Sequence, residues 1–171
     1  MKTICYLEGD ATRPRQPENS GKMIIAHVCN DAGAWGRGFV VELSKVSPLP
    51  EAGYRQWFAN RRNNDFALGR VQFVSIASNL VVANMIGQHL IRAIKGVPPI
   101  RYQAIDTALA AVSRKAAELG ATVHMPRIGC GLAGGAWQQV ELLIKKQLCA
   151  KDVEVFVYDL PAAGNSHVPA I

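Results

Sequence analysis

The sequence predicts an α/β protein in which helices cover both faces of a mixed, mostly parallel central sheet. Short apolar runs typical of strands alternate with longer segments whose apolar residues recur at helical spacing. This alternation is typical of a three-layer α/β/α fold. The 171 residues suit one domain, and the composition, 49% apolar and 19% charged, is that of an ordinary globular protein.

The first part of the chain predicts two strands followed by two helices. The strands are expected over residues 3–8 and 23–29, with a loop rich in proline, arginine and glycine between them. The helices are expected over residues 38–46 and 51–61, because apolar residues follow helical spacing and two prolines divide the segment.

The middle of the chain predicts an antiparallel hairpin. Strands over residues 70–76 and 80–86 are separated by only three residues, and such a hairpin makes the sheet mixed. The second strand is almost wholly apolar, as a strand buried on both faces should be. A loop over residues 87–99 then leads to the clearest helix of the chain, 102–119, which a glycine ends.

The last part of the chain completes the alternation. It predicts a strand over residues 121–125, a helix over 135–149 and a final strand over 153–158. We therefore expect one domain over residues 1–160, followed by a disordered tail over 161–171.

Composition narrows the classes of function. No apolar run reaches the roughly 18 residues that a membrane helix needs, and the N-terminus lacks the pattern of a signal peptide. We expect a cytoplasmic monomer with no membrane partner. The four cysteines form no C-x-x-C pair, so neither a metal nor a bound cofactor is expected. The net charge of +6 favours phosphate ligands, but no basic and aromatic stripe indicates a nucleic-acid site.

Two loops share one design, in which a strand leads through a glycine-rich turn into a helix. They lie at residues 27–38 and 125–135. Glycine lets the backbone approach a ligand closely, and the start of a helix presents free N–H groups that suit phosphate. Loops at the carboxyl ends of strands also line the ligand crevice of α/β sheets. Two such loops facing each other predict a clamp for a diphosphate, whereas either one alone would be interpreted as a tight turn.

The second loop also matches the dinucleotide-binding fingerprint. Gly129, Gly131 and Gly134 have the G-x-G-x-x-G spacing, and Glu154 follows about 20 residues later. A Rossmann half needs a further crossover helix and strand, but here only one strand follows the motif. The context therefore disfavours nicotinamide chemistry.

Four stretches of the sequence together resemble the macrodomain family. They are Gly9-Asp10-Ala11-Thr12, residues 26–31 with 35–39, residues 82–88, and Met125-Pro126-Arg127-Ile128-Gly129-Cys130-Gly131-Leu132-Ala133-Gly134-Gly135. The resemblance covers residues 3–160 and points to the branch of terminal ADP-ribose protein glycohydrolases, with their bacterial or phage-type relatives that process ADP-ribose 1″-phosphate. The last stretch is the most specific of the four.

The resemblance implies a binding site for ADP-ribose. It implies that Asp10 and Ala11 recognise adenine, and that two sets of residues surround the diphosphate and the distal ribose. These sets are Asn30, Gly33, Trp35, Gly36, Arg37, Gly38 and Phe39 from the first loop, and Ile128, Gly129, Cys130, Gly131, Leu132, Ala133 and Gly134 from the second. Cleavage of a conjugate needs a positioned water and often a base. The candidates near the distal ribose are Asp31, Asn30, His27, Gln88 and His89, of which the first three are the predicted catalytic residues.

The sequence departs from the glycohydrolases at positions that matter for their chemistry. Ile86-Gly87-Gln88 stands where that branch has a lysine, and Ala133 where it has an aspartate. Many bacterial relatives carry an acidic residue at the position of Ala136. The lysyl-adduct mechanism therefore has no nucleophile at the expected place.

Three functions follow from these observations. The first is a hydrolase of ADP-ribose conjugates, whose partner would be ADP-ribose on a protein or nucleic acid; the linkage could be an ADP-ribosyl ester, a nucleic-acid adduct, the 1″-phosphate or an O-acetyl ester. The second is a non-catalytic reader of ADP-ribose or sensor of NAD metabolites, which the missing lysine and aspartate favour. The third is a nucleic-acid-binding module that uses the net charge of +6.

Overall fold

A computed structural model describes residues 1–18 and 21–162, and nearly all of the predicted tail, 161–171, lies outside the described residues. The strands are β1 (Ile4–Glu8), β2 (Lys22–Asn30), β3 (Val71–Ala77), β4 (Leu80–Gln88), β5 (Ala121–Pro126) and β6 (Val155–Asp159). The helices are α1 (Phe39–Val46), α2 (Leu49–Ala59), α3 (Tyr102–Leu119) and α4 (Trp137–Gln147), with the 3-10 turns η1 (Arg61–Asn63) and η2 (Cys149–Lys151).

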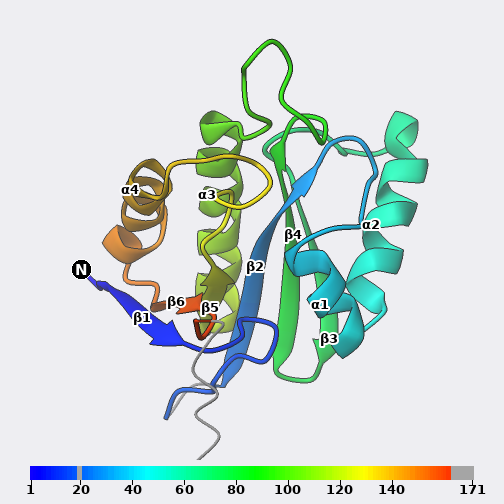
Figure 1. The fold of residues 1–171 in the computed structure, drawn as a ribbon. Coiled ribbons are helices and arrows are strands. Elements are labelled where there is room, and N and C mark those ends of the chain that lie inside the picture. Colours follow the sequence, from blue (N-terminus) through cyan, green and yellow to red (C-terminus); the bar gives the residue numbers. More distant parts are fainter. Residues whose placement is uncertain (19–20, 163–171) are drawn as a thin grey trace, which may run out of the picture.

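One sheet in the order β1-β6-β5-β2-β4-β3 separates two layers of helices. Helices α3 and α4 cover one face and α1 and α2 the other (Figure 1). Strands β3 and β4 are antiparallel, and every other neighbouring pair is parallel. The predicted three-layer fold with a mixed, mostly parallel sheet is therefore confirmed.

Residue alternation along β2 and β4 explains why the sheet has two cores. Ile24 and Ala26 of β2 face a core shared with α3 and α4, whereas Ile25 and Cys29 face the core under α1 and α2. Strand β4 follows the same rule, since Ala83 belongs to the first core and its two neighbours lie on the other face. Both strands are nearly all buried, which accounts for their continuous apolar sequence.

Several predicted boundaries were wrong by one or two residues, and two of these differences have a clear physical reason. Helix α2 begins at Leu49, two residues before the predicted start, because Pro50 sits in its first turn, where a missing N–H costs nothing. Strand β4 continues two residues past its predicted end, because after a bulge in β2 Asn30 pairs with Gln88. This extension brings Gln88 to the edge of the sheet where the two glycine loops lie. Among the described residues no helix is long and apolar enough to cross a membrane.

Candidate ligand-binding site

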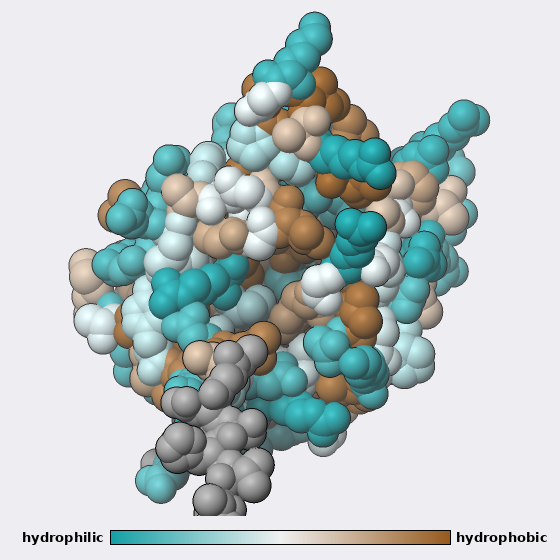
Figure 2. Space-filling model, in the orientation of Figure 1, coloured by the Kyte–Doolittle hydropathy of each residue, from teal (hydrophilic) through white to brown (hydrophobic). Residues whose placement is uncertain are grey.

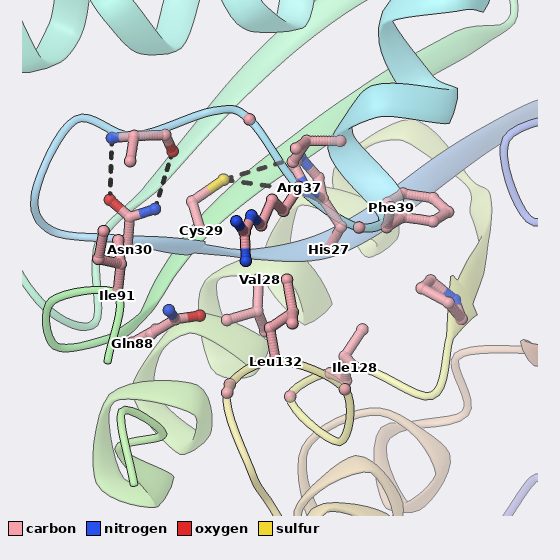
Figure 3. Close-up of a pocket in the computed structure, with 18 of the residues that line it drawn as sticks. His27, Val28, Cys29, Asn30, Arg37, Phe39, Gln88, Ile91, Ile128 and Leu132 are labelled. Carbon is pink, nitrogen blue, oxygen red and sulfur yellow. Dashed lines mark hydrogen bonds between the residues drawn. The ribbon is translucent and has the colours of Figure 1, made fainter. Parts of the chain in front are cut away.

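A cavity of about 640 Å³ opens at the carboxyl ends of β2, β4 and β5 (Figure 3). Its walls come from the first glycine loop (residues 31–38), the second glycine loop (residues 127–136) and the rim loop (residues 89–99) that follows β4. The volume is within the range of small-molecule sites in proteins. The two glycine loops thus face each other across one space, as the sequence pattern predicts.

Asn30 builds the first glycine loop. Its Nδ2 donates to the carbonyl of Ala34 at 2.8 Å, and its Oδ1 accepts from the N–H groups of Ala32 and Ala34 at 3.0 and 3.1 Å. The hydroxyl of Tyr54 donates to the Asn30 carbonyl at 2.7 Å. Figure 3 shows this amide at one end of the cavity, its hydrogen bonds closing the loop. Asn30 therefore lines the site while its side chain holds the loop in shape.

His27 forms a buried hydrogen bond beneath the same loop. It is 1% exposed, and its Nε2 lies 2.5 Å from Oδ1 of Asn84, the residue opposite it on β4. The Nδ2 of Asn84 donates to Pro50 and to Gln72, so its Oδ1 must accept, and the proton of His27 sits on Nε2. Burial lowers the pKa of His27 to about 4, so the ring is neutral at physiological pH. The ring lines the cavity floor as a weak base.

Asp31 ties the first glycine loop to the rim loop. Its Oδ2 is 2.7 Å from Nδ1 of His89, and its Oδ1 accepts the N–H of Leu90 at 2.8 Å. Neither Asp31 nor His89 lines the cavity. The carboxylate that the sequence suggested as a catalytic base is thus engaged in holding two loops together.

The second glycine loop is shaped by packing and by a surface ion pair. Gly129 has a left-handed φ of 71°, and a side chain there would meet Ile100, as would one at Gly135. Arg127 makes a two-pronged ion pair with Asp159, at 2.6 and 2.8 Å, which ties the loop to the end of β6. Desolvation by burial raises the pKa of the Cys130 thiol, so this thiol has no nucleophilic activation.

The charge of the cavity has one sign. Among the described residues, its lining includes Arg37, Arg92 and Arg127 and no aspartate or glutamate. Of these three arginines, only Arg127 has a carboxylate partner among the described residues, namely Asp159. Figure 3 shows the guanidinium of Arg37 within the cavity, across from Leu132 of the second glycine loop. A cavity with two unneutralised guanidinium groups favours a ligand that carries at least two negative charges.

The structure brings most of the predicted site residues to the cavity. Those that line it are His27, Asn30, Gly36, Arg37, Gly38, Phe39, Ile128, Gly129, Gly131, Leu132 and Ala133. Those that do not are Asp10, Ala11, Asp31, Gly33, Trp35, Cys130 and Gly134. Trp35 is 5% exposed and packs between His27 and Tyr54, so it supports the first glycine loop from the core.

Asp10 occupies a turn after β1. Its Oδ1 accepts from the N–H and the hydroxyl of Thr12, at 2.8 and 2.7 Å. Ala11 is almost fully buried. A turn of this kind follows many strands, and recognition of adenine here remains a prediction.

Sequence reasoning missed the third wall of the cavity and the supports behind it. Ile91 and Arg92 of the rim loop line the cavity, while Tyr54 and Asn84 hold Asn30 and His27 from behind. One signal in the sequence could have indicated this wall, because the rim loop directly follows a buried strand and such loops line the ligand crevice of α/β sheets. Within the part of the chain that is described, no three His, Cys, Asp or Glu side chains gather to hold a metal ion.

Several solved structures are about 50% identical to this chain, and two of them illustrate the match. A macrodomain protein from Streptomyces coelicolor is 52% identical, with a TM-score of 0.80 over 91% of this chain and 98% of that one. A protein of unknown function from Bacteroides thetaiotaomicron is 51% identical, with a TM-score of 0.88 over 93% and 99%. Thermosipho africanus DarTG, solved in complex with ADP-ribose, is 16% identical with a TM-score of 0.69 over 96% of this chain and 43% of that one, and shares the fold.

Comparison with curated proteins gives more distant relatives. Chromodomain-helicase-DNA-binding protein 1-like of Danio rerio is 31% identical over 96% of this chain, and the protein of the same name from Mus musculus is 28% identical over 96% of this chain. The chain spans only 16% of the length of the first protein and 19% of the length of the second. An ADP-ribose 1″-phosphate phosphatase of Candida albicans is 26% identical over 84% of this chain and 92% of that protein. No family model matches the sequence.

Proposed function

The chain belongs to the macrodomain family, and from that premise we propose that it binds ADP-ribose and hydrolyses ADP-ribose conjugates. The observation that carries the proposal is the cavity between the two glycine loops, whose described lining residues include three arginines and no carboxylate. A diphosphate fits this charge, and a sugar fits the apolar and amide groups of the lining. The ADP-ribose found with a DarTG of the same fold supports this choice of ligand.

Hydrolysis at the distal ribose is the reaction that the relatives favour. It adds water across the bond between C1″ and its substituent, or across the bond within that substituent, and releases ADP-ribose. The ADP-ribose 1″-phosphate phosphatases among the curated relatives support a reaction of this class. Two side-chain amides line the cavity at the ends of β2 and β4, where the distal ribose is expected; they belong to Asn30 and Gln88. We assign to these amides the positioning of the substrate and a water, because proximity alone supplies a large part of many rate accelerations.

A second candidate function is a non-catalytic reader of ADP-ribose. The observation that favours it is that each predicted catalytic side chain already has a structural role or is a weak base. Asp31 holds the rim loop, Asn30 holds the first glycine loop, and His27 is neutral with a pKa of about 4. Binding needs only the cavity and its arginines. Binding without turnover would therefore be the expected behaviour of a reader.

Turnover separates the two candidates. The purified protein would be incubated with O-acetyl-ADP-ribose, ADP-ribose 1″-phosphate and a peptide ADP-ribosylated on glutamate, and released ADP-ribose would be quantified by chromatography. A hydrolase releases ADP-ribose from at least one substrate, in proportion to protein, and loses this release when Gly131 is replaced by phenylalanine. Tight binding of ADP-ribose with no release above the uncatalysed rate would assign the reader function instead.

A further inference from the structure

One face of α2 lies against the first glycine loop. The residues of this face recur every three or four positions, which places them on the same side of a helix. They are Glu51, Tyr54, Arg55 and Phe58. The hydroxyl of Tyr54 donates to the carbonyl of Asn30 at 2.7 Å, and the ring of Phe58 packs so closely on Gly33 that no side chain would fit there. Figure 1 shows the loop between β2 and α1 running beside α2.

An ion pair on the same face reaches the backbone of the loop. The guanidinium of Arg55 bonds Oε1 of Glu51 through Nε and Nη2, both at 3.0 Å, and its Nη1 donates to the carbonyl of Gly33 at 3.4 Å. The other carboxylate oxygen of Glu51 accepts from Ser44 of α1 at 3.1 Å, and Ser44 accepts the indole N–H of Trp35 at 2.8 Å. Figure 2 shows hydrophilic side chains at the right of the molecule, over α2, where this pair lies at the surface. Glu51 is thus linked to the loop at two places, through Arg55 and through Ser44.

Helix α2 is itself fixed to the sheet by side-chain amides. The Nδ2 of Asn84 donates to the carbonyl of Pro50 at 3.1 Å, and the Nε2 of Gln72 donates to the carbonyl of Gly53 at 2.9 Å. A Cβ at position 53 would lie 3.2 Å from Oε1 of Gln72, so the glycine lets the helix approach β3 closely. Asn84 is fully buried, which makes the attachment a rigid one. Helix α2 therefore transmits the position of the sheet to the loop.

The loop offers its backbone donors to the cavity directly after these contacts. Gly36, Arg37 and Gly38 line the cavity, and among the described residues none accepts a hydrogen bond from their backbone N–H groups. Free N–H groups in a glycine-rich loop before a helix suit an anionic ligand. The hydrogen bonds that lead back to Glu51 engage Gly33 and Trp35, immediately before these donors. The direction of the donors therefore depends on the shape that α2 gives the loop.

We propose that Glu51 is a positioning residue of the ligand site, which keeps the first glycine loop in the shape that binds the diphosphate. The inference rests on the proposed binding of ADP-ribose. Removing the charge of Glu51 leaves the guanidinium of Arg55 beside the loop without its carboxylate partner. Electrostatics alone then predicts tighter binding of an anionic ligand. A loop that loses its support binds more weakly, in proportion to the fraction of molecules that keep the competent shape. The two effects have opposite signs.

The test measures ADP-ribose binding to Glu51→Gln by calorimetry, with Glu141→Gln as the matched control. Glu141 pairs with Lys145 one turn further along α4, as Glu51 pairs with Arg55 in α2, and either variant raises the net charge by one. We expect Glu51→Gln to bind ADP-ribose about three- to ten-fold more weakly, as for the loss of one hydrogen-bonded support. Glu141→Gln should bind like the unmodified protein. Urea denaturation should give similar midpoints for both variants, because exposed ion pairs contribute little to stability.

Hydrogen exchange locates the change within the molecule. In the free protein, Glu51→Gln should speed exchange in a peptide covering residues 31–38 and leave exchange in α3 unchanged, and bound ADP-ribose should restore the protection. A role in overall stability alone would not change exchange in this loop selectively. Arg55→Met removes the same contact with Gly33, so the two substitutions together should cost less affinity than the sum of their separate losses.

The outcomes separate this inference from the proposed function. An affinity of Glu51→Gln equal to or above that of the unmodified protein would overturn the role of Glu51, and so would an equal loss in Glu141→Gln. Failure of the unmodified protein to bind ADP-ribose would refute the proposed function instead. In that case, exchange in residues 31–38 would still show whether Glu51 shapes the loop.

Discussion

Replacing Gly131 by phenylalanine should abolish ligand binding and leave the fold intact. Gly131 lines the cavity, its backbone is outside the left-handed region, and a Cβ added to it meets no atom within 4 Å. The new side chain therefore projects into open space where the ligand would lie. No neighbouring group has to move in the free protein, so the free energy of unfolding should change by less than about 0.5 kcal/mol.

The expected loss of affinity follows from the contacts that the phenylalanine displaces. If it keeps the diphosphate from two backbone N–H donors of the second glycine loop, and each hydrogen bond to a charged group contributes about 1.5–3 kcal/mol, the loss is about 3–6 kcal/mol. That corresponds to roughly a hundred-fold to ten-thousand-fold weaker binding. Calorimetric titration with ADP-ribose measures it, and urea denaturation measures the stability.

Gly129→Ala is the matched control, because this glycine lies two residues away in the same loop. A side chain at Gly129 would disturb the packing of the free protein, whereas one at Gly131 would project into open space. Its φ of 71° is strained for alanine, and a Cβ would lie 2.8 Å from Cδ1 of Ile100. Strain of about 1–2 kcal/mol and overpacking of about 1–3 kcal/mol predict a loss of about 2–5 kcal/mol in unfolding free energy. Undiminished ADP-ribose binding by Gly131→Phe would refute the assignment of the second glycine loop to phosphate.

Three further predictions concern the supports of the site. Asn84→Leu leaves the Nε2–H of His27 buried without an acceptor and should lower the unfolding free energy by about 1–3 kcal/mol. Urea denaturation measures this change, and an unchanged midpoint would contradict the assigned tautomer of His27. His124 is a second buried histidine, on β5, where it forms hydrogen bonds with Thr122 and Tyr158. Burial lowers the pKa values of His27 and His124 to about 4, so below pH 6.5 protons bind mainly to the unfolded chain. The unfolding free energy should therefore fall by about 1.5 kcal/mol per histidine between pH 6.5 and 5, and a flat profile would contradict this. Ala136 is the N-cap of α4 and its side chain makes no capping hydrogen bond, so Ala136→Asp should stabilise the protein by about 1 kcal/mol in thermal denaturation. Many bacterial relatives carry an acidic residue at this position, and if Ala136 replaces a catalytic acid, the same variant should also raise turnover. Unchanged turnover would count against that idea.

The elements of the fold could be predicted from the sequence because their signals are local. Apolar runs gave β2 and β4, helical spacing gave α3 to the residue, and three intervening residues gave the antiparallel hairpin of β3 and β4. Local signals do not encode strand order. Nothing in the chain near β4 indicates that it lies beside β2, and this adjacency sets the third wall of the cavity.

The site was predictable only in part for the same reason. Glycine-rich turns before helices are visible in sequence, and both turns do line the cavity. The hydrogen bonds that shape these turns join distant residues: His27 meets Asn84, and Asp31 meets His89. Asp31 could be interpreted as a base from its position after a strand, whereas its partner 58 residues away makes it a brace between loops.

Calorimetric titration of the protein with ADP-ribose tests the central claim most directly, with AMP and NAD as controls. A cavity between two glycine loops, with Arg37 at its wall and no carboxylate partner for that arginine among the described residues, should bind ADP-ribose selectively. AMP has one phosphate and no distal ribose, and the nicotinamide of NAD occupies the C1″ position, so both should bind more weakly. Selective binding of ADP-ribose is the predicted result, and no heat of binding at millimolar ADP-ribose would contradict the account.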